Sequence, residues 1–535
     1  MYYDYYQSIP TEHGDPVFRG SYSINPTSSS SQEAILIYLK ELAFYLLKLK
    51  EFGANNEIIK ENILEAILGI IANIDYSQER FKRLIIILSQ DLSQARALYA
   101  KLCQQNKLEP KFLKEVFNLG GTSDMVEIIK KSERQYVKRN AMYTFEQKNL
   151  FDIMFSLVKN MCIKIVQIKS YKKDFEKAYN CILEVLKVMN FEDVAIEEVK
   201  SAIKKCISED HNLLKTLSDS QEEAYGERQS VYISFAPRTG KAILVSGIDM
   251  TQLEAVLEAT KGRGVDVYTH GIIMLMAHTL AKFRTYPHLV GHFGKDIDNS
   301  LFDFATFPGA ILMTRYLFQK VEYLYRGRLF TTDSFAPVGI VKIKDDNFEP
   351  LIQAALNLKG FTKKQQKSIK RVGFRQKLME EKIKEIIGKM EKNEIKHLYI
   401  IGLLNEADGS REYFDEFLKL LPKDCYAVSL AYDKNEENIL HVDSLYDYLL
   451  VYKALEKFNE IKSLNRLNIS IFITKCDQYT ITNVMNFIHM GVKNIFLCKC
   501  IPTLLNPSLA ETMRKIFGIK EISSPEQDLA KTLAE

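Results

Sequence analysis

Apolar residues recur every three or four positions through most of the chain from Ser30 to Asp219, and this spacing predicts helices. Ser30 and Glu33 have the spacing of a capping box, which predicts that the first helix begins at Ser30. Further helices are predicted over residues 56–73, 78–106, 146–168, 171–190 and 195–208. No repeat signature runs through them, so we expect a helical-bundle domain at 31–222, preceded by an irregular arm at 1–30.

Short apolar runs replace the helical spacing near Glu222. Strands are predicted over residues 230–236, 242–247, 265–269, 310–314 and 339–343, with helices over 251–260 and 274–284. A second set has strands over 397–404, 426–432, 469–474 and 494–498, with helices over 412–420, 444–463 and 480–489. Alternating strands and helices favour parallel sheets covered on both faces.

The predicted fold class is therefore a multidomain α/β protein. The helical-bundle domain precedes two doubly wound, Rossmann-like α/β domains, at 223–365 and 366–535. A lysine-rich run at 362–375 lies between them, and we interpret it as the solvated face of a helix.

Charge and composition exclude several classes of protein. Lys and Arg number 72 against 68 Asp and Glu, a net charge of +4, so nothing favours nucleic acid or an anionic membrane as a partner. No apolar run approaches the ~20 residues that cross a bilayer, and the N-terminus has no secretory pattern. Eight cysteines in 535 residues do not indicate a disulfide framework, so a reducing, cytoplasmic location is predicted.

Two glycine-containing segments and a group of histidines are weak candidates for chemistry. PRTGK at 237–241 and KGRGVD at 261–266 lack the spacing of phosphate-binding or dinucleotide-binding loops, so turns are favoured. Four histidines lie close together in sequence: His270, His278, His288 and His292. Imidazole is a common metal ligand, but no ligand-spaced Cys or carboxylate accompanies them, which favours structural histidines.

Cysteines near the ends of two predicted strands are the remaining candidates. Cys498 and Cys500 are two residues apart, so in an extended chain both thiols point to one side and could hold a soft metal or form a redox pair. Cys476 and Asp477 follow the preceding strand. With His270 they form a speculative metal site; the alternative is ordinary thiols.

A set of segments in this order resembles the hybrid cluster protein (prismane, hydroxylamine reductase) family. The segments are VDVYTHG (265–271), YPHLVGHFG (286–294), FPGAILMT (307–314), RLFTT (328–332), PKDC (422–425) and MGVKNIF (490–496). The resemblance implies a helical domain with two α/β domains, an N-terminal iron–sulfur cluster and a mixed iron–sulfur–oxygen hybrid cluster. It also implies reduction of hydroxylamine or nitric oxide, with electrons from a redox partner.

The residues that would hold both clusters in such a family differ here. The resemblance places the first cluster on four cysteines in the opening residues, where Tyr3 and Tyr6 stand and the first cysteine is Cys103. The ligands of the hybrid cluster, expected as His, Glu, Cys, Cys, Cys, Cys and Glu, correspond to Ile248, Ile272, Leu317, Leu404, Tyr432, Ala454 and Asp477. Apolar side chains in a former cluster pocket would fill a void that otherwise leaves polar groups unpaired.

These differences lead to a main hypothesis and an alternative. The main hypothesis is a non-catalytic pseudoenzyme of this family that binds no cofactor and acts in binding, scaffolding or regulation with a protein partner or a small molecule. The alternative is a hydroxylamine or nitric oxide reductase-type oxidoreductase whose atypical metal site uses Cys476, Asp477, Cys498, Cys500 and His270. A plain structural subunit of an assembly is a third possibility.

Overall fold

The computed structural model forms two compact units. One comprises Met1–Leu213 and Pro502–Thr512, and the other comprises Leu214–Ile501 and Met513–Glu535. The structure describes residues 26–71, 78–113, 124–190, 194–294, 300–315, 323–333, 339–363, 366, 368–402, 410–430, 438–442, 448–459, 464–473, 480–497 and 507–534. The division into 1–30, 31–222, 223–365 and 366–535 stays a prediction.

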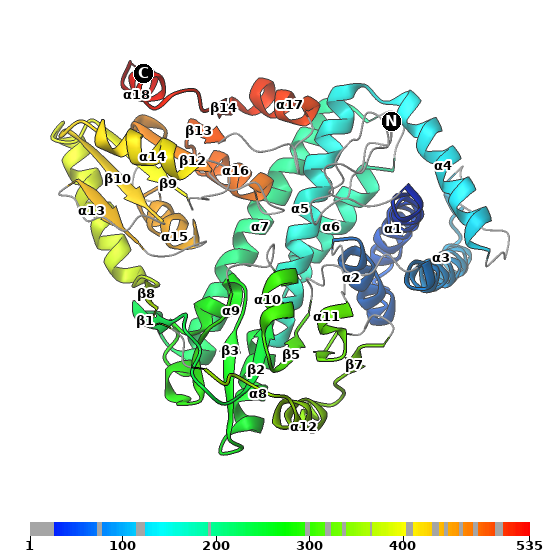
Figure 1. Ribbon diagram of the computed structural model, residues 1–535. Coiled ribbons are helices and arrows are strands. Elements are labelled where there is room, and N and C mark those ends of the chain that lie inside the picture. Colours follow the sequence, from blue (N-terminus) through cyan, green and yellow to red (C-terminus); the bar gives the residue numbers. More distant parts are fainter. Residues whose placement is uncertain are drawn as a thin grey trace. The chain divides into compact units, whose positions relative to one another are not determined.

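The first unit is built of long helices (Figure 1). They are α1 (Pro26–Glu51), α2 (Glu57–Ile71), α3 (Gln78–Gln105), α4 (Met125–Met142), α5 (Phe145–Ser170), α6 (Glu176–Val188) and α7 (Ile196–Tyr225), the last of which continues into the second unit. Helix α1 packs against α3, α4 and α6, and α5 packs against α2 and α6. Apolar residues at helical spacing, such as Ile35, Leu39 and Leu42, are buried along α1 and form this core.

Local sequence signals fix some helix ends and not others. At the start of α5, Thr144 Oγ1 accepts from the Gln147 N–H (3.2 Å) while Gln147 Oε1 accepts from the Thr144 N–H (2.9 Å), a complete capping box. The predicted start of the first helix at Ser30 is wrong, because α1 already begins at Pro26. Proline suits a first helical turn, whose N–H groups have no partner within the helix.

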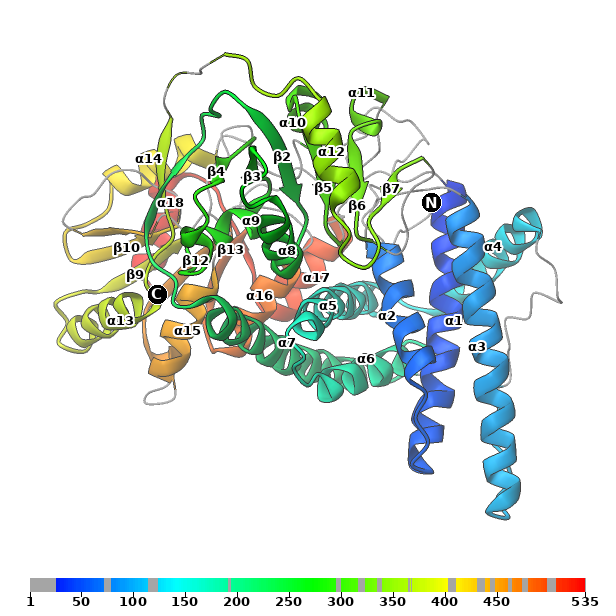
Figure 2. The same cartoon turned by 90° about the horizontal axis from the view of Figure 1, so that it is seen from below.

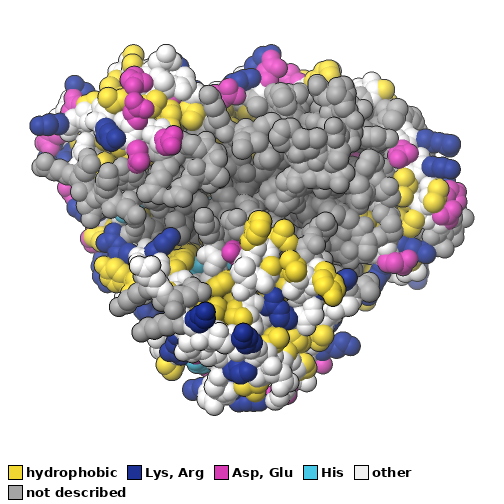
Figure 3. All heavy atoms as spheres, in the orientation of Figure 1, with side chains coloured by type: hydrophobic (Ala, Val, Ile, Leu, Met, Phe, Trp, Pro, Cys, Tyr) yellow, Lys and Arg dark blue, Asp and Glu magenta, His cyan; other side chains and the backbone are white. Residues whose placement is uncertain are grey.

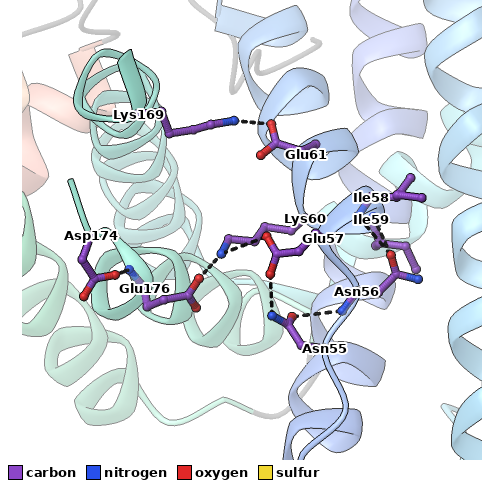
Figure 4. A network of polar contacts seen from close by, with 10 residues as sticks. All are labelled: Asn55, Asn56, Glu57, Ile58, Ile59, Lys60, Glu61, Lys169, Asp174 and Glu176. Carbon is purple, nitrogen blue, oxygen red and sulfur yellow. Dashed lines mark hydrogen bonds and ion pairs between the residues drawn. The ribbon is translucent and has the colours of Figure 1, made fainter. Parts of the chain in front are cut away.

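A buried lysine connects α2 to α6 in this unit (Figure 4). The ammonium of Lys60 contacts Glu176 and lies 3.5 Å from Glu57. It also lies 4.7 Å from the ring centre of Phe175 and 5.3 Å from that of Tyr179. Two carboxylates and two aromatic faces together offset the cost of burying one charge.

The second unit contains two parallel six-stranded sheets (Figure 2). The first has the order β4-β3-β2-β5-β6-β7. Its strands are β2 (Lys241–Ser246), β3 (Val265–Thr269), β4 (Leu289–His292), β5 (Ala310–Met313), β6 (Leu329–Thr331) and β7 (Val341–Lys342). Its helices are α8 (Met250–Thr260), α9 (Ile272–Ala277), α10 (Ser300–Thr306), α11 (Tyr323–Arg326) and α12 (Glu349–Asn357), with a 3₁₀ turn, η2 (Phe283–Thr285).

The second sheet has the order β11-β10-β9-β12-β13-β14. Its strands are β9 (His397–Ile401), β10 (Cys425–Ser429), β11 (Ile439–His441), β12 (Ile469–Ile473), β13 (Asn494–Leu497) and β14 (Lys520–Glu521). The remaining elements are α13 (Gln376–Glu391), α14 (Ser410–Lys419), α15 (Tyr448–Asn459), η5 (Leu464–Arg466), α16 (Thr480–His489), α17 (Pro507–Phe517) and α18 (Pro525–Ala534). The ring centres of Phe414 and Phe417 in α14 each lie 5.2 Å from that of Phe472 in β12. These rings form part of the hydrophobic core on one face of this sheet.

The central strands explain why the sequence predicts parallel sheets. Every residue of β5, β9 and β12 is buried, and such uninterrupted burial requires helices on both faces. The predicted fold class is therefore confirmed. Within the described residues, no helix is long and apolar enough to cross a membrane.

The sheet predicted for one strand is wrong, and so is one predicted helix. The segment 230–236 was expected in the first parallel sheet, but β1 (Val231–Ser234) pairs antiparallel with β8 (Ile369–Val372) in a separate ribbon. The lysine-rich run at 362–375 was expected to be helical, yet it contains β8. Side-chain spacing does not identify the partner of a strand when that partner lies more than a hundred residues away, because the pairing is set by tertiary contacts.

Candidate functional site

The carboxyl edge of the first sheet, between β2 and β5, is the place where its topology favours ligand binding. Strands β3 and β4 lie on one side of β2 in the sheet, and β5 lies on its other side, so the strand order reverses between β2 and β5. Ligands of open parallel sheets bind outside the carboxyl ends of the strands, where the strand order reverses. Strand β2 ends at Ser246 and β5 at Met313, so the following residues form this edge.

A glycine allows the two strand ends to lie against each other. Gly247 has φ +110°, and a Cβ atom there would lie 2.3 Å from Thr314 Oγ1 and 2.6 Å from the Thr314 carbonyl oxygen. The Thr314 hydroxyl donates to the carbonyl oxygen of Ser246 (3.0 Å) and accepts from the Asp249 N–H (3.2 Å). Asp249 then caps α8 by accepting from the Thr251 N–H (3.0 Å).

Replacing Gly247 with alanine should lower the free energy of unfolding by about 2–4 kcal/mol, because the new Cβ meets backbone atoms and adopts a strained φ. Urea denaturation would measure this change. The matched control is Gly388→Ala in α13, where no atom lies within 4 Å of the added Cβ and alanine favours the helix. A Gly247→Ala protein as stable as the control would contradict this account of the turn.

His270 links three elements at this edge. Its Nδ1 lies 2.9 Å from Ser246 Oγ at the end of β2, and its Nε2 lies 3.2 Å from Asp303 Oδ2 in α10. Both Ser246 and His270 are fully buried. The arrangement of hydroxyl, imidazole and carboxylate fixes the ring and can hold a proton at either ring nitrogen. The burial of Ser246 gives no support to a nucleophilic role, since such a hydroxyl must reach its substrate.

Thr269 joins two further histidines. Its hydroxyl lies 2.9 Å from His278 Nε2 and 2.9 Å from His292 Nδ1. A hydroxyl has one hydrogen, so it can donate to only one of these nitrogens and must accept from the other. Burial lowers the pKa of His278 to about 4, against a smaller opposing hydrogen bond with the Gly291 backbone. His278 is therefore neutral at neutral pH and serves as a fixed dipole.

The four histidines do not form one cluster. His270 and His292 stack, with ring centres 6.4 Å apart and planes at 7°, and His278 joins them through Thr269. His288 precedes β4, at the opposite edge of the sheet, and its Nε2 lies 2.9 Å from the carbonyl oxygen of Leu257. Sequence spacing alone did not single out Ser246, Thr269 or Asp303 as their partners.

The described residues do not supply the donor set of an iron–sulfur cluster. No group of three or more His, Cys, Asp or Glu side chains in this part of the chain could hold a metal ion. The cysteines that are described, Cys103, Cys162, Cys181, Cys206 and Cys425, are all buried. The first four lie in helices of the first unit, and Cys425 begins β10, so none shares the edge that carries His270.

Only some of the predicted ligand positions fall within the described residues. Ile248 is buried directly after Gly247, Ile272 begins α9 and is half-buried, and Ala454 is buried in α15. Tyr3, Tyr6, Leu317, Leu404, Tyr432, Cys476, Asp477, Cys498 and Cys500 lie outside the described residues. Cys476 and Asp477 follow β12 in the sequence, and Cys498 and Cys500 follow β13. These two strands are adjacent in the sheet, and Ile473 of β12 pairs with Leu497 of β13.

A pocket of about 440 Å³ lies at the amino-terminal edge of β3. Several of its polar groups already have partners: Arg238 contacts both oxygens of Asp266 at 2.6 Å, and the Tyr286 hydroxyl donates to Glu258 at 2.6 Å. Apolar side chains gather instead over α10 and α11 (Figure 3). Tyr323, Phe302 and Leu324 are well exposed there.

Comparison with known proteins identifies the family. The model of the Prismane/CO dehydrogenase family matches residues 31–438. The chain belongs to this family. It is 26% identical over 519 residues to the hydroxylamine reductase of Acidiphilium cryptum (strain JF-5), covering 94% of this chain and 93% of that one. It is 27% identical over 548 residues to the hydroxylamine reductase of Rippkaea orientalis (strain PCC 8801 / RF-1), covering 96% and 97%.

The fold of this Prismane-family chain is also that of a solved structure. That structure, described as NiZn[Fe4S4] and NiNi[Fe4S4] clusters in the alpha subunits of acetyl-CoA synthase/carbon monoxide dehydrogenase, aligns with a TM-score of 0.50 and 10% identity. The alignment covers 99% of this chain and 87% of the other. At this identity the likeness shows the fold alone. The resemblance to the hybrid cluster protein family is confirmed.

The prediction that the chain binds no cofactor is wrong. It conflicts with the family match and with full-length relatives that are hydroxylamine reductases. The prediction rested on aligned positions that lack thiolates, and most of those positions lie outside the described residues. The lack of a thiolate at an aligned position does not exclude a ligand that comes from another segment of the chain.

Proposed function

We propose that this chain is an oxidoreductase of the hydroxylamine reductase type with an atypical metal site. The observation that carries the proposal is the match to hydroxylamine reductases along nearly the whole of both chains. The reaction cleaves the N–O bond of hydroxylamine and yields ammonia and water, with two electrons and two protons taken up. A reduced electron carrier would supply the electrons as a protein partner, and we propose a cytoplasmic location.

The residues that would hold the metal in this proposal come directly after strands in the sequence, and most of them follow β12 and β13. Cys476 and Asp477 follow β12, and Cys498 and Cys500 follow β13, its paired neighbour. Thiolates are the usual protein ligands of iron–sulfur groups, which supply electron transfer when bound. His270 is the remaining candidate, and its hydrogen bonds to Ser246 and Asp303 would fix the ring.

An anaerobic assay tests the proposal. The full chain, purified without oxygen, should contain iron and acid-labile sulfide and should oxidise dithionite-reduced methyl viologen when hydroxylamine is added, with ammonia as product. The Cys498→Ser/Cys500→Ser variant should lose iron and turnover together. His288→Asn, on the opposite edge of the first sheet, is the matched control for His270→Asn and should keep its activity. An iron-loaded protein without turnover would refute the proposal.

A second candidate is a non-catalytic member of the family kept for binding, scaffolding or regulation. Ile248 favours it, because this buried apolar side chain follows Gly247 at the edge where the resemblance implies a histidine ligand. Under this candidate the anaerobic protein shows no hydroxylamine-dependent oxidation at any iron content. To test this candidate, the chain is immobilised and a catalytically active hydroxylamine reductase from the same host is passed over it. Retention of that enzyme would support the candidate.

A further inference from the structure

Two buried thiols lie side by side in the first unit, away from the candidate site. Cys181 in α6 and Cys206 in α7 have their Sγ atoms 3.7 Å apart, and both side chains are fully buried. This distance is about that of two sulfur atoms in van der Waals contact. Cys103, Cys162 and Cys425 have no sulfur–sulfur contact of this kind among the described residues.

We propose that Cys181 and Cys206 are a site of reversible oxidation and that they form a disulfide when the protein reacts with a peroxide. One thiolate attacks a peroxide oxygen, the O–O bond breaks, and a sulfenic acid forms with release of water or an alcohol. The second thiol then attacks the sulfenic sulfur, the S–S bond forms and water leaves. The two thiols lose two electrons and the peroxide gains them; a small dithiol returns the pair to the reduced state.

The geometry needs only a small movement. A disulfide has an S–S distance of about 2.05 Å, so the two sulfur atoms must approach by roughly 1.7 Å. Helices α6 and α7 are already tied together beside the pair, because Lys205 of α7 forms an ion pair with Glu184 of α6. Glu184 lies one turn after Cys181, and Lys205 directly precedes Cys206. This ion pair therefore holds the two helices together beside the two sulfur atoms.

The environment makes oxidation slow and dependent on pH. The hydrogen bond with Cys181 and burial together raise the pKa of the Cys206 thiol well above its ordinary value. Since the thiolate reacts and the thiol does not, little of the reactive form exists at neutral pH. Oxidation should accelerate as the pH rises or when a low concentration of urea loosens α6. An exposed, low-pKa sensor cysteine would behave differently and react quickly at neutral pH.

Closure would affect the helix that enters the second unit. The cross-link would fix the first half of α7 to α6, and α7 continues to Tyr225 beyond the boundary at Leu213. It would also close a loop from residue 181 to residue 206, which restricts the unfolded chain and stabilises the folded one. The inference is independent of the proposed function, because it concerns other residues and needs no turnover.

Peroxide treatment of the full chain tests the site. The protein is incubated with hydrogen peroxide at pH 7 and pH 9, free thiols are alkylated, and the digest is analysed by mass spectrometry without reduction. The expected result is a peptide pair joined through Cys181 and Cys206, formed faster at pH 9 and lost after dithiothreitol. The oxidised protein should melt several degrees higher than the reduced protein.

Matched variants separate this site from general oxidation. Cys181→Ala and Cys206→Ala should each abolish the linked peptide pair and the rise in melting temperature, whereas Cys103→Ala should keep both. The wild-type digest decides the question even where a variant fails to fold. Oxidation to sulfinic acids without the linked pair, or a cross-link to another cysteine, would overturn the proposal. A lower melting temperature of the cross-linked protein would overturn it as well.

Discussion

Replacing Asp210 with alanine is expected to lower the free energy of unfolding by about 3–5 kcal/mol. Asp210 in α7 is fully buried, and its Oδ1 lies 2.6 Å from the ammonium of Lys164 in α5, whose side chain is 9% exposed. The substitution leaves a positive charge in the helical core with its counter-ion removed. Both residues lie in the first unit, so the loss should appear in the unfolding transition of the helices, followed by circular dichroism in urea.

An exposed pair on the same helix provides the control. Lys200 and Glu197 lie 3.4 Å apart with side chains 34% and 85% exposed, and such pairs contribute about 0–1 kcal/mol. Glu197→Ala should therefore change stability by less than 1 kcal/mol. The double variant Lys164→Met/Asp210→Leu replaces both charges with apolar groups and should recover most of the loss. A single Asp210→Ala variant as mild as the Glu197→Ala control would show that Lys164 finds water or another partner.

The parts of the fold that could be predicted are those that local spacing determines. Apolar residues every three or four positions located α1, α2, α3, α5 and α6, because each helix buries one face in the bundle core. Helix α4 was missed: it is rich in charge, and few of its described residues are buried. Strand β6 has three residues and β4 contains a glycine, so both depend on neighbouring strands that the local sequence does not show.

The candidate site was predicted less well, because its residues meet only through the sheet. The histidines were visible as a group in the sequence, and a strand was predicted to end at Thr269, directly before His270. Ser246 comes from β2 and Asp303 from α10, 24 and 33 residues from His270, and no motif connects them. The sequence favoured structural histidines over a metal site, but it did not show how they divide: β4 runs from one edge of the sheet to the other and so separates His288 from His292.

The buried histidine at this edge should make the protein less stable in mild acid. Burial lowers the pKa of His278 from 6.5 to about 4, so between these values the unfolded state binds more protons than the folded state. Stability from this group is therefore complete above pH 6.5 and is lost as the pH falls toward 4. The difference corresponds to roughly 3 kcal/mol by linkage. Urea denaturation at half-unit intervals of pH would measure the slope.

His278→Gln isolates this contribution, since the amide can still bond to Thr269 Oγ1 but does not titrate in this range. The variant should be less dependent on pH than the wild type between 6.5 and 4, by the same roughly 3 kcal/mol. Below pH 4 both proteins bind their protons equally in the folded and unfolded states at this position, so the two stability curves should run parallel. Parallel curves throughout the window would instead mean that His278 is hydrated, so that burial does not keep it neutral. Thr269 also contacts His292 and directly precedes His270. Protonation of a hydrated His278 would therefore disturb the other two histidines of this sheet edge, at pH values where the folded protein is still populated.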